Sequence, residues 1–472
     1  MRAYVLRSLV VLLLPYSVFS QGNNSDNSDA FMLRQIYDKS LTKSECYEDL
    51  RYLCKQIGGR LSGSEGLEKA ITWAQSKLMG IADTVYLQEV SVPHWFRGEE
   101  TAIFTDSYES TERLTICALG GSVGTNGKTL TGKIIEVRGL AELAELPADS
   151  IKGRFVFYNR PMDPKLIDTF ESYGGCVDQR SSGAAEAAQY GAIGVIVRSM
   201  SHKKDDNPHT GVQRYKEGVA KIPAAAISVE DAEWLSNQLV GDPQGTLSLK
   251  MDCWELPDKP SYNVIAEIKG KTDPNTFIAV GGHLDSWDNN EGAHDDGAGV
   301  VQSMEMLRLI KKLKINNRNT IRCVLFTNEE NGARGAIEYA RSIRELQQTH
   351  IAAIESDRGG FTPRGFSLEA IAKKEGSALE LMVSWSDLFK PYGVHHFVKG
   401  PSGVDVSKLK DQGVVCIGFV PDSQRYFDHH HARSDVFEAV NKRELELGAA
   451  TITALVYLID KYGLDYSPKT AE

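Results

Sequence analysis

The stretch Gly-Gly-His-Leu-Asp at positions 281–285 decides the fold of this chain. It follows the apolar, β-branched run 277–280, which predicts a buried strand that ends at His283 and Asp285. A second polar stretch, Gly-Ala-His-Asp-Asp-Gly at 292–297, precedes residues 298–313, whose apolar positions recur at helical spacing. A strand, a polar loop and a helix in this order indicate an α/β sheet. Such sheets bind their ligands at the carboxyl ends of the strands, where His283 and Asp285 would lie.

Three further strands are predicted from short apolar runs, and acids or imidazoles follow each of them. These strands and the groups behind them are 320–326 with Glu329 and Glu330, 351–354 with Asp357, and 414–419 with His429, His430, His431 and Asp435. Burying several carboxylates together is very costly unless cations neutralise them, so this pattern predicts a metal site. Histidine, aspartate and glutamate without cysteine suit zinc, with cobalt or manganese as alternatives.

In these residues the chain resembles the two-zinc family of aminopeptidases and carboxypeptidases. The resemblance is carried by His283-x-Asp285, Asp295, Glu329-Glu330, Asp357, His431-x-x-x-Asp435, and the segments 60–64 and 259–266. It covers nearly the whole chain beyond the N-terminal segment and implies an α/β fold with a mixed central sheet flanked by helices. Aminopeptidase relatives carry a Gly-Ser-Asp-His type of substrate loop, whereas residues 402–406 lack the histidine. This difference favours the carboxypeptidase branch.

The resemblance also implies a role for each group. Two zinc ions would be bridged by Asp295, with the remaining ligands His283 and Asp357 for one ion and Glu330 and His431 for the other. Asp285 would accept the second ring N–H of His283 and fix its tautomer. Glu329 would be the general base that takes a proton from the attacking water. Neighbouring side chains in an extended segment point in opposite directions, so Glu330 can bind metal while Glu329 faces the substrate.

Some assignments remain open at this stage. Asp296 is interpreted as a helix-start residue, favoured near the positive end of the helix dipole, but it could bridge in place of Asp295. The side chain of His294 is expected to point away from the metals. His431 has the family's four-residue spacing to the next aspartate, so it is preferred to His430 as the ligand. His430 would then be a catalytic residue that stabilises the tetrahedral oxyanion through its ring N–H.

The N-terminus predicts export. Residues 1–20 have a positively charged start, an apolar middle and a polar end, which is typical of a secretory signal peptide cleaved near Ser20. The apolar run is too short for a stable membrane anchor. Residues 21–29 form a polar tract expected to be disordered, with a glycosylation sequon at Asn23 that matters in a eukaryotic source. The resemblance adds a removable propeptide, and hence a zymogen, at 21–44.

Length and charge limit the remaining possibilities. A chain of 472 residues predicts two or three domains, and a net charge of −10 argues against nucleic acid or an anionic membrane as a partner. We expect a catalytic domain in two parts, 45–119 and 256–472, around an insert at 120–255. The insert resembles the small β-rich protease-associated domain and carries no catalytic constellation. It would cover one side of the active site or form a dimer contact.

Seven cysteines in an exported chain leave at least one without an intramolecular partner. Cys46 and Cys54 fall in a predicted helix, where eight residues span about 12 Å, beyond disulfide reach. Cys323 and Cys416 lie in predicted central strands and are expected to be buried thiols. Cys117 and Cys253 flank the insert and are the expected disulfide pair.

These expectations describe a secreted or lysosomal exopeptidase with two zinc ions, which hydrolyses dipeptides or short peptides with free termini. The resemblance also implies a homodimer. The alternatives are an aminopeptidase on longer peptides, a metal-dependent amidohydrolase of a modified amino acid, and a non-catalytic, receptor-like relative. The last class should have lost a ligand or the base, whereas this chain retains all of them.

Overall fold

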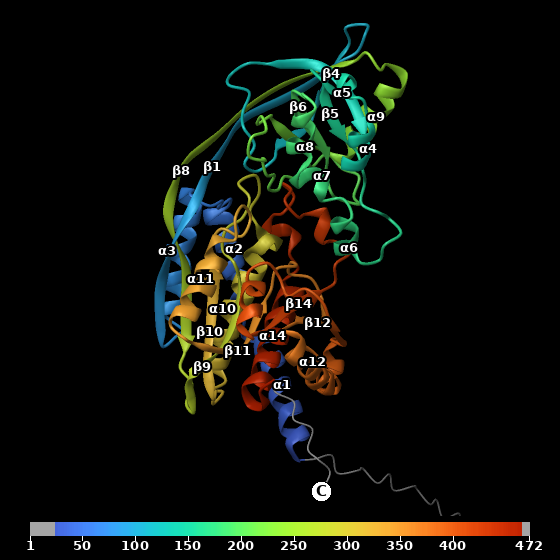
Figure 1. The fold of residues 1–472 in the computed structure, drawn as a ribbon. Coiled ribbons are helices and arrows are strands. Elements are labelled where there is room, and N and C mark those ends of the chain that lie inside the picture. The colour runs from blue at the N-terminus through green and yellow to red at the C-terminus, as the bar shows by residue number, and fades with distance from the viewer. Residues whose placement is uncertain (1–23, 465–472) are drawn as a thin grey trace, which may run out of the picture.

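The computed structural model describes residues 24–464, so the expected signal peptide lies outside the described residues. Two lobes are joined by a long antiparallel ribbon of β1 (Thr84–Thr105) and β8 (Thr246–Ile268), seen along one side of the molecule in Figure 1. A mixed 14-stranded sheet runs through both lobes. The expected α/β architecture, a mixed sheet flanked by helices, is confirmed.

The larger lobe contains the strands predicted to carry the site. Its sheet has the order β13-β12-β14-β11-β9-β10-β8. The bounds are β9 (Asp273–His283), β10 (Asn319–Phe326), β11 (Thr349–Glu355), β12 (Pro363–Glu369), β13 (His396–Lys399) and β14 (Val415–Pro421), with β2 (Thr111–Leu114) pairing only with β1. The neighbours β14, β11, β9 and β10 are parallel, so their carboxyl ends share one edge of the sheet.

Both faces of this sheet are buried, which explains why its strands read as apolar runs. Along β10, Cys323 and Leu325 join the core on one face, and Val324 and Phe326 join the core on the other. The first core is shared with helices α1 (Asn24–Lys43), α2 (Cys46–Tyr52), α3 (Glu65–Met79), α10 (Ala298–Lys312), α12 (Ala372–Ser384), α13 (Ser386–Phe389) and α14 (Lys442–Tyr462). The second core is shared with α11 (Arg334–Glu345) and the 3-10 segment Val406–Gln412.

Apolar periodicity predicts helices at 67–79, 298–313 and about 442–462, and α3, α10 and α14 agree with these ranges to within two residues. Local capping explains where α14 begins, because the Asn441 side chain accepts hydrogen bonds from the backbone N–H groups of Arg443 and Glu444. Its apolar residues are buried against α1 and α10.

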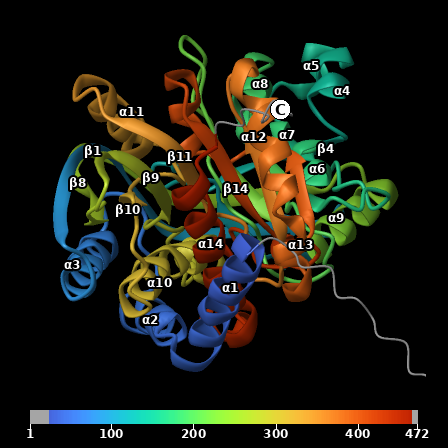
Figure 2. The ribbon, with the colours of Figure 1, turned by 90° about the horizontal axis from the view of Figure 1, so that it is seen from below.

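The N-terminal tract differs from the prediction. Residues 24–43 form helix α1, so the expected disorder of 21–29 is wrong from residue 24 onward. Figure 2 shows α1 lying beside α14. The buried carboxylate of Asp29 binds side chains of α14, namely Tyr457, Lys461 and Tyr462. These contacts between distant segments order a stretch whose composition alone favours disorder.

The smaller lobe, the insert, consists of residues 116–118 and most of the predicted range 120–255. Its strands are β3 (Ile116–Ala118), β4 (Leu130–Val137), β5 (Phe155–Tyr158), β6 (Gly194–Arg198) and β7 (Ala224–Ile227), and its helices are α4 (Leu140–Glu145), α5 (Ala148–Ile151), α6 (Thr169–Gly174), α7 (Asp178–Ser181), α8 (Gly183–Gln189) and α9 (Val229–Gly241). Since β4 to β7 are parallel and helices lie between them, the insert is an α/β lobe rather than a β-rich one. The expected boundary between 255 and 256 falls inside β8, which is continuous between the lobes.

All seven cysteines lie in the described part of the chain and all are buried free thiols. The expected Cys117–Cys253 disulfide is therefore wrong. Instead, the Cys117 sulfur accepts a hydrogen bond from the Arg97 guanidinium at 3.0 Å. Within residues 24–464, no helix combines the length and apolarity needed to cross a bilayer.

Candidate metal centre

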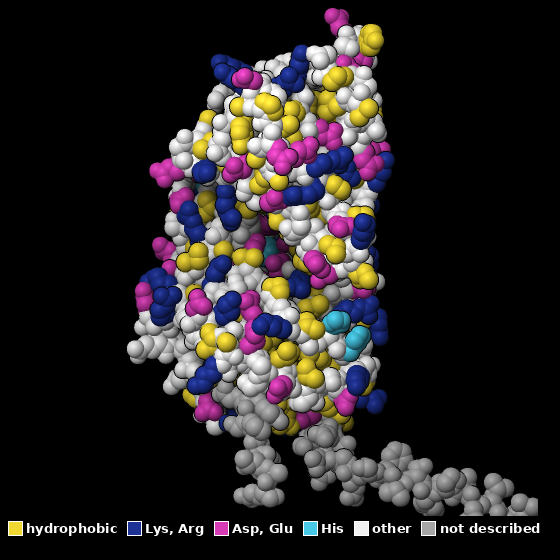
Figure 3. Space-filling model, turned by 45° about the vertical axis from the view of Figure 1, so that its right-hand side comes forward, with side chains coloured by type: hydrophobic (Ala, Val, Ile, Leu, Met, Phe, Trp, Pro, Cys, Tyr) yellow, Lys and Arg dark blue, Asp and Glu magenta, His cyan; other side chains and the backbone are white. Residues whose placement is uncertain are grey.

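Six of the predicted site residues line a cavity of about 410 Å³ between the two lobes. Figure 3 shows the corresponding hollow, with histidine and acidic side chains at its base. The larger lobe lines it with Asp295, Glu329, Glu330, Asp357, His430 and His431. The insert covers it with Phe170, Tyr173, Arg180, Val212 and Arg214. The arrangement supports the prediction that the insert covers one side of the active site.

One candidate metal position lies at the end of β9. His283 Nε2 is 3.2 Å from Asp295 Oδ1 and 3.4 Å from Asp357 Oδ1. The other ring nitrogen, Nδ1, lies 3.0 Å from the backbone carbonyl of Asp285. Because a carbonyl only accepts hydrogen bonds, Nδ1 carries the proton and the lone pair of Nε2 faces the two carboxylates.

The second candidate position lies beside His431. Its Nε2 is 3.1 Å from Glu330 Oε2 and 3.4 Å from Asp295 Oδ2. Its Nδ1 lies 3.2 Å from the carbonyl of Thr210, in the insert, which again assigns the proton to Nδ1. The two carboxylate oxygens of Asp295 thus face different histidines, as a bridging ligand requires.

The buried polar atoms of the centre fit divalent cations. Within residues 24–464, four of the proposed metal ligands each have a buried atom without a hydrogen-bond partner: His283 Nε2, Asp295 Oδ2, Glu330 Oε1 and Asp357 Oδ1. Unpaired buried polar groups are costly, and here they converge from three loops. Imidazole and carboxylate donors together suit zinc. The donor set therefore fits two zinc ions, one at each position.

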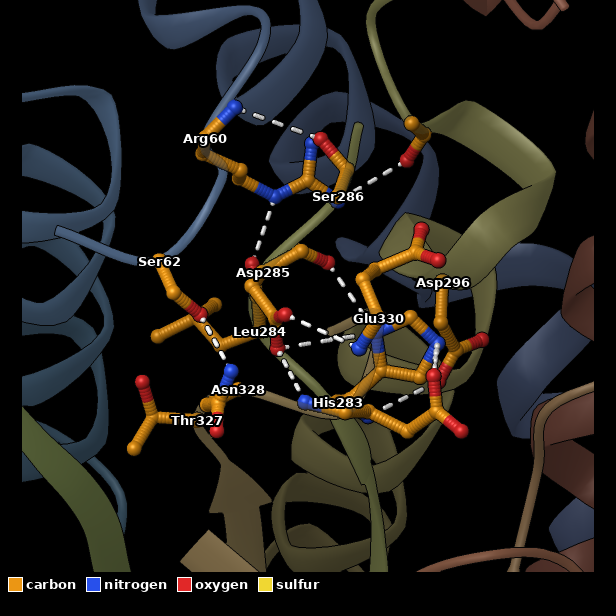
Figure 4. A network of polar contacts seen from close by, with 12 residues as sticks. Arg60, Ser62, His283, Leu284, Asp285, Ser286, Asp296, Thr327, Asn328 and Glu330 are labelled. Atoms are coloured by element: carbon orange, nitrogen blue, oxygen red, sulfur yellow. Dashed lines mark hydrogen bonds and ion pairs between the residues drawn. The ribbon is translucent and has the colours of Figure 1, made fainter. Parts of the chain in front are cut away.

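Asp285 lies where the sequence predicts, but its atoms have different partners (Figure 4). The ring N–H of His283 binds the carbonyl of Asp285, and the nearest carboxylate oxygen is 3.8 Å from Nδ1, too far for a hydrogen bond. That carboxylate instead accepts the backbone N–H groups of Glu329 at 3.0 Å and Glu330 at 3.2 Å. The expected contact is therefore corrected: Asp285 orients His283 through its backbone and the glutamate pair through its side chain.

Hydrogen bonds help to assign the two residues next to Asp295, which are Asp296 and His294. Both oxygens of Asp296 accept backbone N–H groups at 3.0 Å, from His283 and from Gly299 in the first turn of α10. This geometry agrees with a helix-start role and favours Asp295 as the bridge. His294 points away from the centre, since its Nδ1 accepts a hydrogen bond from Gly360 and its ring stacks on Phe361.

The two consecutive histidines of the C-terminal loop lie at different distances from the centre. His430 Nε2 is 3.8 Å from Asp295 Oδ2, farther than the 3.4 Å of His431, and the two rings are stacked at 3.6 Å. Burial lowers the pKa of His430 to about 3, so its imidazole is neutral and keeps one N–H donor. Its proposed contact with an oxyanion stays a prediction.

The candidate base has a strongly shifted pKa. Burial, reinforced by the nearby carboxylates of Asp357 and Asp285, raises the pKa of Glu329 to about 8, although His283 opposes the shift. Burial also raises the pKa of Glu330 well above its usual range. Divalent cations favour the charged carboxylate forms and would reverse these shifts.

Several residues that shape the centre carry no recognisable functional signal in the sequence. Arg60 is fully buried and donates to the carbonyls of Leu284, Glu291 and Gly292, which holds the loop between His283 and Asp295. Figure 4 shows this guanidinium beside the site loop. Arg60 belongs to a segment that resembles the family, but its spacing to the site gives no hint of this contact. Thr210 orients His431 through a backbone carbonyl, which no side-chain pattern can reveal.

Comparison with known proteins gives a consistent result. Residues 263–456 match peptidase family M28. Carboxypeptidase Q of Bos taurus is 35% identical over 425 residues, which cover 90% of this chain and 86% of that protein. The crystal structure of a peptidase M28 precursor from Shewanella amazonensis SB2B has a TM-score of 0.88 at 32% identity, covering 95% of this chain and 100% of that chain. A zinc aminopeptidase from Bacillus subtilis has the same fold, with a TM-score of 0.63 at 21% identity over 92% of this chain and 97% of that chain.

Proposed function

Because the chain belongs to peptidase family M28 and is a metallo-exopeptidase, we propose that it hydrolyses dipeptides or short peptides with free termini at a centre of two zinc ions. The observation that carries this proposal is the position of Asp295, whose two carboxylate oxygens face His283 and His431 at 3.2 and 3.4 Å. The similarity to carboxypeptidase Q supports the carboxypeptidase branch.

Residues of the chain would bind the two zinc ions and transfer the proton of the attacking water. His283 and Asp357 would hold one ion, Glu330 and His431 the other, and Asp295 both. Bound zinc would polarise the scissile carbonyl and make a water molecule more acidic. Glu329 would take the proton of the attacking water and deliver it to the leaving amine. His430 would donate its ring N–H to the oxygen that becomes negative.

The size of the site favours short substrates. The cavity of about 410 Å³ lies near the lower end of the roughly 300–1,000 Å³ usual for small-molecule sites. The insert closes one side of it, through a backbone bridge between His209 and Ala432 and a hydrogen bond from Thr210 N to His431 O. This arrangement supports a dipeptide substrate over a long peptide. Secretion, glycosylation at Asn23, zymogen processing and assembly into a homodimer belong to the same proposal and stay predictions.

The proposal is tested with a panel of dipeptides and tripeptides whose termini are free or blocked, before and after chelation. Activity should require metal, and elemental analysis should find about two zinc ions per chain. Glu329→Gln should keep the zinc but lose about 10²- to 10⁴-fold in kcat. The matched control Glu345→Gln, on the exposed side of α11, should match the wild type. Turnover that survives chelation, or full activity of Glu329→Gln, would contradict the mechanism, and a wild type inactive on the whole panel would favour the receptor-like alternative.

A further inference from the structure

Arg180 of the insert is a buried cation that lines the cavity without an acidic partner. Its residue exposure is 6%, yet its side chain forms part of the cavity wall. Within residues 24–464, no carboxylate oxygen lies within 4.0 Å of its guanidinium. A buried charge is costly unless an opposite charge compensates it, so the partner of this cation needs an explanation.

The guanidinium is held rigidly by uncharged groups. One terminal nitrogen donates to the Tyr173 hydroxyl at 2.6 Å, and the other makes a long contact of 3.4 Å with the Thr210 carbonyl. The backbone of Gly211 lies flat against it, since a Cβ there would be 2.4 Å from Arg180 Cζ. Only glycine fits at this position, and the close packing keeps the planar guanidinium in place.

The nearest metal-ligand candidate does not neutralise this charge. Arg180 Nη1 is 3.3 Å from His431 Nδ1. Because His431 donates its Nδ1–H to Thr210, two donors face each other and no hydrogen bond forms. The guanidinium therefore borders the second metal position with its positive charge unpaired.

Among the groups that line the cavity, the carboxylates leave Arg180 without a counter-charge. Two divalent ions would balance the four carboxylates of the lining, which are Asp295, Glu329, Glu330 and Asp357. Two further cations, Arg214 and Lys408, are exposed at the same cavity, and neither has an ion-pair partner in the part of the chain described. The cavity wall is thus complementary to a ligand that carries a negative group beside the metals.

We propose that Arg180 binds the free C-terminal carboxylate of the peptide substrate. This inference rests on the proposed peptidase function and deepens it. A guanidinium binds a carboxylate through two parallel N–H donors and orients it. Because Arg180 borders His431, a carboxylate bound there lies only one residue from the bond that is cleaved. The residue released is then the C-terminal one, and Arg180 is the specificity-determining residue. Arg214 and Lys408 attract the same carboxylate into the cavity.

The test compares a dipeptide with its C-terminal amide, using wild type, Arg180→Met and Arg180→Lys. Wild type should prefer the free acid, and Arg180→Met should lose about 30-fold or more in kcat/KM for the acid but less than about threefold for the amide. Arg180→Lys keeps the charge without the planar fork and should lie between them. Arg433→Met is the matched control, because Arg433 joins the same loop to the insert through Asn207 outside the cavity lining.

A second measurement separates substrate binding from a purely structural role. Binding of a non-cleavable phosphinic pseudodipeptide, as acid and as amide, is followed by calorimetry with the zinc content recorded. The proposal predicts weaker binding of the acid alone, with unchanged zinc. Equal losses for acid and amide, or a loss of zinc, would overturn it, since Arg180 would then only position His431. A wild type that binds the acid through Arg180 yet cleaves no peptide would refute the peptidase function and leave this inference standing.

Discussion

Replacing Ile36 by alanine tests whether helix α1 is a permanent part of the fold or a removable segment. Ile36 is fully buried in the core shared with α14, whereas Phe31, on the same helix, is 62% exposed. Removing a buried isoleucine side chain costs about 2–5 kcal/mol of unfolding free energy. Phe31→Ala, the matched control, should change it by no more than about 0.5 kcal/mol.

Deleting the whole of helix α1 should lower the free energy of unfolding more than the single substitution does. Leu33 and Ile36 are both fully buried, and at about 1.5–3 kcal/mol each they contribute about 3–6 kcal/mol, as an upper estimate. The Tyr37 hydroxyl also bonds the Thr451 side chain of α14 at 2.8 Å. Against a typical total of about 5–15 kcal/mol, a chain that begins at Glu45 should be severely destabilised, while one that begins at Asn24 should fold.

Urea unfolding followed by circular dichroism and fluorescence measures these changes. The midpoint should fall for Ile36→Ala with an unchanged slope, because the surface exposed on unfolding stays nearly the same. If Ile36→Ala and Phe31→Ala unfold at the same midpoint, or if the chain from Glu45 is as stable as the chain from Asn24, the reasoning is refuted. Residues 24–43 would then qualify as the removable propeptide that the family resemblance implies.

Two further predictions concern the metal centre. His431→Ala should lose about half of the bound zinc, whereas His430→Ala should keep it and lose activity; elemental analysis giving the reverse order would exchange the two roles. In the zinc-free protein, the raised pKa of Glu329, about 8, and those of Glu330 and Asp357 make the protonated forms the stable ones. Above about pH 6.5 the buried histidines with lowered pKa, such as His430, are neutral in both the folded and the unfolded state. The thermal midpoint should therefore fall as pH rises from about 6.5 to about 8, while zinc affinity rises over the same window because the ligands must be deprotonated. A zinc-free midpoint that rises with pH would contradict the burial of these carboxylates.

The convergence of the site could be predicted from the sequence for a geometric reason. His283, Glu330 and Asp357 each follow an apolar run, and the runs belong to neighbouring parallel strands. The carboxyl ends of parallel strands share one edge, so groups that follow them meet whatever their distance along the chain. Apolar periodicity likewise located α10 and α14, because this signal lies within the segment itself.

Contacts between distant segments could not be predicted in this way. The polar composition of residues 24–29 favours disorder, but Asp29 finds three partners on α14. Asp285 has the residue type expected of a carboxylate partner for His283, yet its side chain binds two backbone N–H groups that no side-chain pattern specifies. Cys117 and Cys253 flank the insert in the sequence, but the fold places the Arg97 guanidinium against the Cys117 sulfur.

The two candidate metal positions therefore differ in how they are built. The first takes His283 and Asp357 from adjacent strands of one lobe, and a local backbone carbonyl orients the histidine. The second depends on His431, whose ring is oriented by Thr210, 221 residues earlier in the chain. Docking of the insert thus fixes the imidazole tautomer at one position and brings Arg180 to the same place. Because a single contact surface does both, the second metal position and the proposed carboxylate subsite can exist only while the two lobes are docked.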